Sequence, residues 1–250
     1  MTTEQRLADV FVALAGGPAA GSPQDPTDLL GTLSILAHHS PPLLGVRAAA
    51  VVFVPGGREA PQVVSSDTRV YRMEYAAVGH REGPAHDCHH GDRRPAPVPL
   101  DSPQARGRWP HYAPRAVALG YTHVAALPLR GHTRNSGALV LLSSGHRSGF
   151  SPGVLALGQS MADFTAVTLE RAQEADHSRT LAAQLEQALT SRVVIEQAKG
   201  MIAARRSLSL NDAFDLLRRH ARSHRRLLSD VAREVVEGRA DPELSGERVN

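Results

Sequence analysis

The spacing of apolar residues predicts two helices at the start of the chain. Residues 4–15 carry apolar side chains three and four positions apart, which is the helical interval, and a second stripe of this kind runs from Leu29 to Ala37. Proline interrupts the helical hydrogen-bond ladder, so we expect the second helix to end before Pro41 and Pro42. The segment between these helices is rich in proline, glycine and serine and is expected to be a loop.

Four short apolar runs predict the strands of a sheet, at residues 48–54, 62–66, 123–129 and 137–143. Pro55-Gly56-Gly57 follows the first run and favours a hairpin turn. A helix is expected over residues 69–78, and residues 79–114, rich in His, Pro, Gly and Arg, are expected to form a loop region with short elements of its own. This order predicts an α+β domain in which helices flank a central antiparallel sheet.

A long helix is predicted to begin at Pro152, because Ser151 can cap it and proline suits the first helical position. No further proline occurs before Arg206, which is typical of an extended, coiled-coil-prone helix. One row of its seven-residue repeat turns basic at Arg192, so we expect a dimer seam to give way there to a binding face. The predicted seam consists of Leu181, Leu185, Ala188, Ile195 and Ile202.

Two shorter amphipathic helices follow the long one. Ser209 and Asp212 form a capping box with Asp in place of Glu, and the apolar stripe behind them ends near His224. A third helix is expected over residues 228–236, and the tail after Gly238 has no periodicity and is expected to be disordered. Three such helices predict a small all-α bundle or half of a dimeric one.

Charge is distributed unevenly along the chain. The net charge is +3, but residues 190–240 carry 11 basic and 6 acidic side chains, a local +5. Such a patch is typical of a polyanion-binding surface, and an ordinary solvated helix surface is the alternative. Lys199 is the only lysine, and the neighbouring Gly200 would let an RNA backbone approach the helix closely; helix packing is the rival explanation for the glycine.

The basic residues follow two arrangements. Arg192, Lys199 and Arg206 are seven apart and therefore share a helix face, where Glu196 can hold the first two side chains extended. Five arginines crowd the junction between the last two helices: Arg218, Arg219, Arg222, Arg225 and Arg226. This stripe and cluster match a folded phosphate backbone.

Several function classes lack their sequence signals. There is no phosphate-binding glycine loop, zinc-protease motif, paired CxxC or nucleophile elbow, so we do not expect an enzyme. No apolar run reaches the ~20 residues of a membrane span, and the first residues show no signal-peptide pattern. With Cys88 as the single cysteine, a reducing cytoplasm fits best.

One segment has metal-like composition: His86, Cys88, His89, His90 and Asp92. On a strand, His86, Cys88 and His90 would share a face. Metal or haem binding, redox sensing by Cys88 and an ordinary polar loop are the three interpretations; we expect the loop and no metal, because structural zinc sites usually use paired ligand spacings. Trp109, the only tryptophan, is expected to be a buried anchor or a wall of a ligand pocket.

Residues 189–237 resemble the ANTAR domain, the RNA-binding module of bacterial transcription antiterminators. The resemblance rests on Arg192, the run 195–200 (IEQAKG), Ala213-Phe214, Leu217-Arg218, Ala221, Leu228 and Val231-Ala232. It implies a dimer that binds paired stem-loops in a nascent leader RNA, with Ala198 among the contact residues. Relatives often read Ser-His-Asn after the second helix, whereas this chain has Arg225 in place of Asn, which puts loop-base contacts at this corner in doubt.

Residues 5–172 resemble a GAF sensor domain more loosely. The resemblance rests on residues 82–84 (EGP), 108–110 (RWP), 125–129 (AALPL) and 137–139 (GAL). Relatives frequently have Cys where this chain has Ala85. The resemblance implies a sensor pocket near Trp109, Cys88 and His86, which takes an unidentified small ligand or none, with no known cofactor.

We therefore expect a GAF-like domain over residues 1–172, a coiled-coil linker helix over 173–189, an ANTAR module over 190–240 and a disordered tail over 241–250. The predicted function is a signal-responsive RNA-binding regulator of transcription termination, acting as a homodimer. RNA polymerase or an upstream signalling protein is a further candidate partner. The alternative is a DNA-binding or protein-interaction regulator whose helical module only dimerises.

Overall fold

A computed structural model describes residues 3–16, 29–55, 60–91, 96–132, 135–145 and 150–245. The chain divides into two compact units, an N-terminal unit of residues 1–175 and a C-terminal unit of residues 176–250. Helix α7, Pro152–Arg206, contributes its first part to one unit and its last part to the other. None of the helices in these ranges combines the length and apolar content needed to cross a bilayer.

The N-terminal unit is built on the predicted antiparallel sheet. Its five strands are ordered β2-β1-β5-β4-β3, and every neighbouring pair is antiparallel. The four predicted strands are confirmed, and a short β3 joins the edge. Their bounds are β1 Ala48–Phe53, β2 Gln62–Ser65, β3 Val98–Pro99, β4 His123–Arg130 and β5 Asn135–Ser143.

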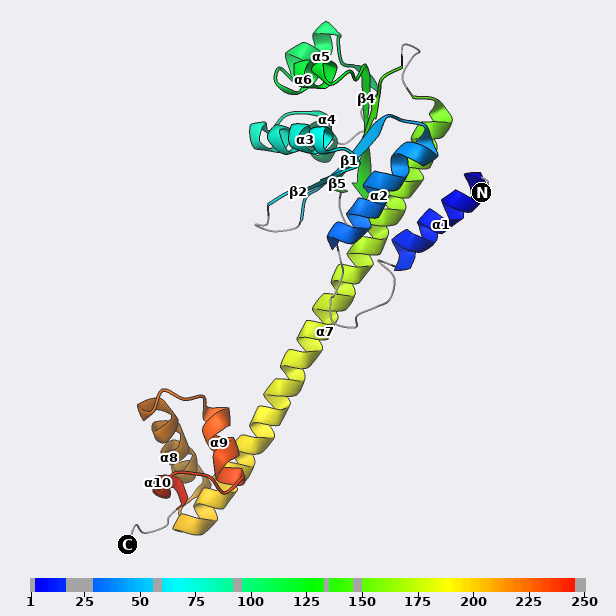
Figure 1. Cartoon of the computed structure of the whole chain (residues 1–250). Helices are drawn as coiled ribbons and strands as arrows, with labels where there is room; N and C mark the ends of the chain where they lie inside the picture. Colours follow the sequence, from blue (N-terminus) through cyan, green and yellow to red (C-terminus); the bar gives the residue numbers. More distant parts are fainter. Residues whose placement is uncertain are drawn as a thin grey trace. The chain divides into compact units, whose positions relative to one another are not determined.

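Both faces of this sheet are covered, because successive residues of a strand point to opposite sides. In β1, Ala48, Ala50 and Val52 pack toward α3–α6, whereas the residues between them pack toward α1, α2 and the first part of α7 (Figure 1). The result is a sheet with a helical layer on each face. The helices are α1 Thr3–Gly16, α2 Leu29–Leu44, α3 Thr68–His80, α4 Pro84–His90, α5 Pro103–Arg108 and α6 Tyr112–Ala118.

The predicted end of α2 was wrong, because the helix continues through Pro41 and Pro42 to Leu44. The two prolines remove only two N–H donors near the end of the helix, whereas Leu36 and Leu44 are buried against the sheet. Packing of the last turn therefore outweighs the local preference for stopping before proline.

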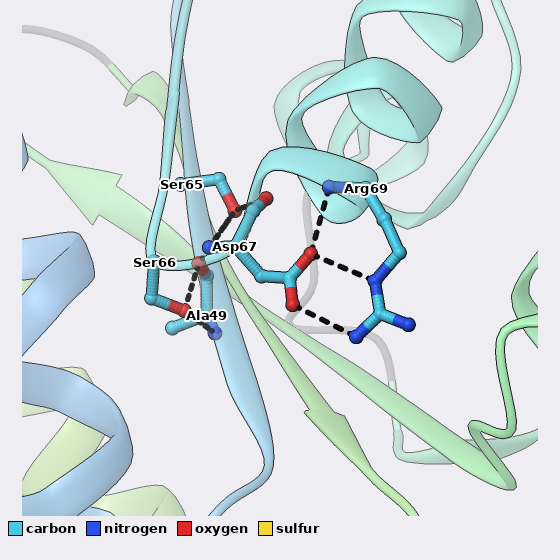
Figure 2. Close-up of polar contacts among 5 residues, drawn as sticks. All are labelled: Ala49, Ser65, Ser66, Asp67 and Arg69. Carbon is cyan, nitrogen blue, oxygen red and sulfur yellow. Dashed lines mark hydrogen bonds and ion pairs between the residues drawn. The ribbon is translucent and has the colours of Figure 1, made fainter.

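A polar corner fixes where α3 leaves the sheet (Figure 2). The Ser66 hydroxyl accepts a hydrogen bond from the Ala49 N–H at 3.0 Å, which ties the end of β2 to β1. Asp67 caps α3 by accepting from the Arg69 N–H at 2.7 Å, and the Arg69 guanidinium reaches the same carboxylate at 3.1 Å. The Arg69 side-chain hydrogen bond lowers the pKa of the Asp67 carboxyl. These contacts fix the start of α3 and the direction in which the helix leaves the sheet.

Residues 79–114 contain short elements, as expected, but the metal-like cluster does not form a strand. His86, Cys88 and His90 lie on α4, where His86 and His90 share a face and Cys88 points away from it. Cys88 is buried in the core, whereas the rings of His86 and His90 stack with centroids 4.2 Å apart. The expected polar loop was therefore wrong for residues 84–90, because Pro84 suits the first helical position and favours a helix. Asp92 lies outside the described residues.

The C-terminal unit is a small helical bundle formed by the last part of α7, α8 Leu210–Ser223, α9 Leu228–Val236 and α10 Pro242–Ser245. Ser209 caps α8 as predicted, accepting from the Asp212 N–H at 3.1 Å. The expected disorder of the tail was wrong for residues 242–245, because Leu244 is buried in the bundle core and holds α10 there. Residues 246–250 lie outside the described ranges.

Candidate nucleic-acid interface

The predicted dimer seam divides into two parts in the structure. Ile202 is fully buried in the core of its own bundle, so its assignment to a seam between chains was wrong, whereas Ile195 is only partly buried against that core and its place in the seam stays a prediction. Four large apolar side chains further up α7 are instead about half exposed or more. They are Leu181 at 49%, Leu185 at 58%, Leu189 at 64% and Val193 at 55%.

Ala188 is also exposed, and together these residues form an apolar row on α7 that the C-terminal unit does not cover. Sequence reasoning missed Leu189 and Val193 because they follow a four-residue interval rather than the seven-residue repeat. The signal was present as four apolar residues in a row at i, i+4, i+8 and i+12.

Ala198 and Gly200, both predicted to contact RNA, differ in their surroundings. Ala198 is fully buried in the bundle core, so its assignment to an RNA contact was wrong. A Cβ added at Gly200 would meet nothing within 4 Å. Close packing inside this chain therefore does not require the glycine, and packing against a second copy of the helix remains the rival explanation.

Lys199 is held by its own chain. Its Nζ lies 2.9 Å from both carboxylate oxygens of Glu196 and 5.3 Å from the centroid of the Phe214 ring, and its side chain is only 16% exposed. The expected bridge from Glu196 therefore forms to Lys199, and Arg192 has no ion pair among the described residues. These contacts place α7 against α8 at this point and partly compensate the lysine charge.

Three of the predicted arginines are also engaged within the bundle. The Arg226 guanidinium makes a two-pronged ion pair with Glu234 of α9, at 2.8 and 2.5 Å, and lowers the pKa of that carboxyl. Arg206 donates to the Glu243 carbonyl of α10, and Arg219 donates to the Asp215 carbonyl at 3.3 Å. These side chains are exposed, but part of their hydrogen-bonding capacity holds the bundle together.

Of the arginines predicted to bind RNA, four are exposed and have no ion pair or side-chain hydrogen bond within the described part of the chain: Arg192, Arg218, Arg222 and Arg225. We call them the arginine surface. Phe214, Arg218 and Arg222 are four apart and run along one flank of α8, so the two arginines continue the line that begins where Lys199 meets Phe214. Unpaired guanidinium groups on a helical flank are suited to binding phosphate groups.

Arg225 also has an unusual backbone. Its φ is +53°, in the left-handed region that favours glycine or asparagine. The Arg225 N–H bonds the Arg222 carbonyl at 3.2 Å and the Arg226 N–H bonds the Ala221 carbonyl at 2.8 Å, which is the Schellman pattern at the end of α8. The backbone at this position therefore favours glycine or asparagine for a reason that is independent of any contact with bases.

A second candidate site lies in the N-terminal unit, where the described residues line a partly open cavity of about 480 Å³ between the sheet, α3 and α4. His86 lines this cavity, but Trp109 and Cys88 do not. Trp109 is a buried anchor whose Nε1 donates to Asp87 at 2.8 Å. Of the three residues predicted for a sensor pocket, only His86 lines this cavity, and its role in ligand binding stays a prediction.

Glu74 is the residue of this cavity that sequence reasoning missed. It is buried, lines the cavity and accepts a 2.6 Å hydrogen bond from the Tyr112 hydroxyl. Burial raises the pKa of the Glu74 carboxyl to about 7, and the hydrogen bond from Tyr112 opposes the shift. A carboxylate beside Met73 on the apolar stripe of the helix was the available signal.

Comparison with known proteins bears most directly on the C-terminal unit. Residues 183–236 match the family model of the ANTAR domain, so this unit contains an ANTAR domain. The match begins in the exposed apolar row and covers the arginine surface. No curated protein matches the chain.

Solved GAF domains are similar to the chain at low identity. The GAF domain of a phosphoenolpyruvate-protein phosphotransferase from Acinetobacter is 13% identical with a TM-score of 0.47, covering 70% of this chain and 97% of that one. The GAF-B domain of DevS from Mycobacterium smegmatis is 17% identical with a TM-score of 0.40, covering 60% of this chain and 96% of that one.

Proposed function

We propose that this chain is an RNA-binding regulator of transcription termination whose C-terminal unit binds stem-loops through the arginine surface. The observation that carries the proposal is the arginine surface itself, four exposed arginines without an ion pair or side-chain hydrogen bond in the described structure, all inside the region that matches the ANTAR domain. Phosphate contacts by such side chains supply most of the affinity of nucleic-acid binding. Lys199 and Gly200 adjoin this surface and belong to the same proposed interface.

The proposal includes a homodimer. The exposed apolar row of Leu181, Leu185, Leu189 and Val193 has no cover within the C-terminal unit, and a second copy of the same helix presents a self-complementary row. Burying large apolar side chains of this kind stabilises association by roughly 1.5–3 kcal/mol for each fully buried residue. Paired chains would then present two arginine surfaces, as binding to paired stem-loops requires.

The signal is proposed to enter through the N-terminal cavity. Its size suits a small organic ligand, and its wall combines apolar groups with Glu74, Glu82 and the histidines of α4. A carboxyl that can change protonation near neutral pH offers a hydrogen-bond donor or a negative charge to a ligand. This composition favours a small polar or cationic molecule.

The test compares stem-loop RNA with duplex DNA, using the full chain at several salt concentrations. Each phosphate contact contributes about 0.7–0.9 to the slope of log affinity against log salt, so Arg218→Ala with Arg222→Ala should flatten the slope by about 1.5 and weaken RNA binding at least about tenfold.

The matched control removes the same charge from the end of the bundle outside the arginine surface. Arg233 and Arg239 pair with Asp230 and Glu237, and replacing both by Ala should change RNA affinity much less. Equal loss in the two double variants would mean that only net charge matters. Equal affinity for duplex DNA would contradict the RNA proposal.

A further inference from the structure

The end of α8 brings two histidines next to the segment that leads into α10. His220 and His224 are one helical turn apart, and their rings stack with centroids 4.2 Å apart. Together with Asp241 they form a group in which one donor atom from each residue lies within 4.8 Å of the others. Glu243 adds a carboxylate oxygen 3.5 Å from the Nδ1 of His220.

The state of His220 points to a ligand. Its side chain is only 6% exposed, and its Nδ1 is buried with no hydrogen-bond partner in the part of the chain that the structure describes. Leaving a buried polar atom unsatisfied costs free energy, and such atoms in native proteins are nearly always paired. A bound cation would satisfy this nitrogen.

His224 is already oriented in the way that metal-binding histidines usually are. Its Nδ1 lies 3.0 Å from the carbonyl oxygen of His220. A proton on Nδ1 donates to that carbonyl and leaves Nε2 with a lone pair for a metal ion. Ligating histidines commonly donate their other ring N–H to a backbone carbonyl in this way, which fixes both the tautomer and the ring orientation.

We propose that His220, His224 and Asp241 bind a divalent transition-metal ion of the Zn²⁺ class, with Glu243 as the fourth ligand. Two imidazoles with carboxylate oxygens are a donor set that Zn²⁺ prefers, and the two carboxylates neutralise its charge. Tetrahedral bonds of about 2.0–2.2 Å place donors about 3.4 Å apart, so the exposed His224 and Asp241 side chains must close by roughly 1 Å around the buried His220.

The bound ion would fasten α10 to the end of α8, in addition to the burial of Leu244. None of the proposed ligands belongs to the arginine surface, and Arg222 and Arg225 are their neighbours along the chain. Sequence reasoning did not find it because Asp241 and Glu243 lie beyond α9, and only the folding of the tail brings them to the histidines.

The experiment titrates the metal-stripped full chain with Co²⁺, whose visible absorption reports tetrahedral coordination, and then with competing Zn²⁺. The unmodified chain should bind at this site, and His224→Gln or Asp241→Asn should weaken binding at least about 100-fold, because even outer-shell partners of metal ligands contribute 10–100-fold. Both side chains are exposed, and Asn keeps an oxygen that can cap the Glu243 N–H as Asp241 does.

A matched histidine pair in the N-terminal unit supplies the control. His86 and His90 are also one turn apart with ring centroids 4.2 Å apart, but the neighbouring Asp87 is bound by Arg108 and Trp109. His86→Gln with His90→Gln should leave the Co²⁺ spectrum unchanged, and circular dichroism should show that every variant is folded. The proposal is overturned if the unmodified chain gives no tetrahedral spectrum, if both C-terminal variants bind as tightly as it does, or if the α4 double variant abolishes binding.

Discussion

The N-terminal unit encloses a buried carboxyl group, whereas the C-terminal unit presents its charges to solvent. Glu74 is buried beside a cavity and carries a raised pKa. Arg192, Arg218, Arg222 and Arg225 are exposed, and an arginine side chain is always charged in proteins. Burial tunes a group for small-molecule binding or protonation, and exposure keeps a charge available to a polyanion. The N-terminal unit is thus suited to binding a small molecule or a proton, and the C-terminal unit to binding a polyanion.

The two units also differ in the size of their hydrophobic cores. The sheet unit buries apolar residues on both faces of five strands, with Leu139 and Leu141 on one face and Val140 and Leu142 on the other. The bundle has a much smaller core, centred on Leu217 and Ile202. A small core is less tolerant of a cavity, because fewer contacts compensate for those that are lost.

The largest expected effect follows from this difference. Leu217→Ala should destabilise the bundle by about 2–5 kcal/mol, the usual cost of a leucine-sized cavity in a core. The only tryptophan, Trp109, lies in the N-terminal unit, so its fluorescence reports that unit alone, whereas circular dichroism reports the helices of both. We expect the helical signal to melt earlier in the variant while the fluorescence transition stays in place.

Leu139→Ala, which opens a cavity in the sheet unit, is the matched control and should move the fluorescence transition. If Leu217→Ala shifts both transitions equally, the two units unfold as one cooperative body. The two units of the structure would then not be separate units of unfolding.

The next effect concerns Glu74 and pH. The folded-state pKa is about 7 and the ordinary value is 4.5, so the folded unit binds more protons than the unfolded chain between these values. Stability from this group is fully present below pH 4.5 and is lost as pH rises through 7, by up to about 3 kcal/mol at 1.36 kcal/mol per pH unit. Glu74→Gln keeps the acceptor for Tyr112 and should remove this loss.

The measurement is the free energy of unfolding of the N-terminal unit, followed by Trp109 fluorescence at pH 5 and pH 8. The variant should be the more stable protein at pH 8 and should show a flatter pH profile. Parallel profiles for the two proteins would show that the buried carboxyl is not what titrates.

The sequence predicted features that depend on neighbours along the chain. The four main strands, the cap at Ser209 and the start of α7 all follow from local periodicity or from one capping residue. It did not predict whether an apolar residue is buried within one chain or between two chains. A seven-residue repeat marks Ile202 as apolar, but the repeat is the same for a residue in the core of one bundle and for a residue in a seam between two chains. The same limit hid α10, whose burial rests on Leu244 in an otherwise polar tail.

A smaller effect is expected at the end of α8. Arg225 adopts a left-handed backbone, which costs a non-glycine L-residue roughly 1–2 kcal/mol and asparagine less. Arg225→Asn should therefore stabilise the bundle by about 1 kcal/mol or less while weakening RNA binding, because it removes one of the four surface arginines. Arg222→Asn is the control, since it removes the same charge from a helical position and should weaken RNA binding without any gain in stability.

If Arg225→Asn binds RNA as tightly as the unmodified chain, Arg225 does not belong to the interface. If it also fails to stabilise the bundle, the left-handed conformation carries no strain. Thermal unfolding followed by circular dichroism and RNA titration at one fixed salt concentration separate the two outcomes.

The smallest effect on stability is expected at Gly200. A substitution there should raise the stability of the bundle and lower its affinity for RNA. An added Cβ meets nothing within 4 Å, and alanine is favoured over glycine in a helix interior by about 0.5–1 kcal/mol, so Gly200→Ala should raise the stability of the bundle slightly. If an RNA backbone approaches α7 at this point, the same methyl group keeps it away and lowers affinity. Gly153 lies in the same helix and also faces open space, but it belongs to the N-terminal unit, so Gly153→Ala should leave RNA binding unchanged. A Gly200→Ala variant that is more stable and binds RNA as well as the unmodified chain would exclude close approach at this residue and confine the proposed interface to the arginines.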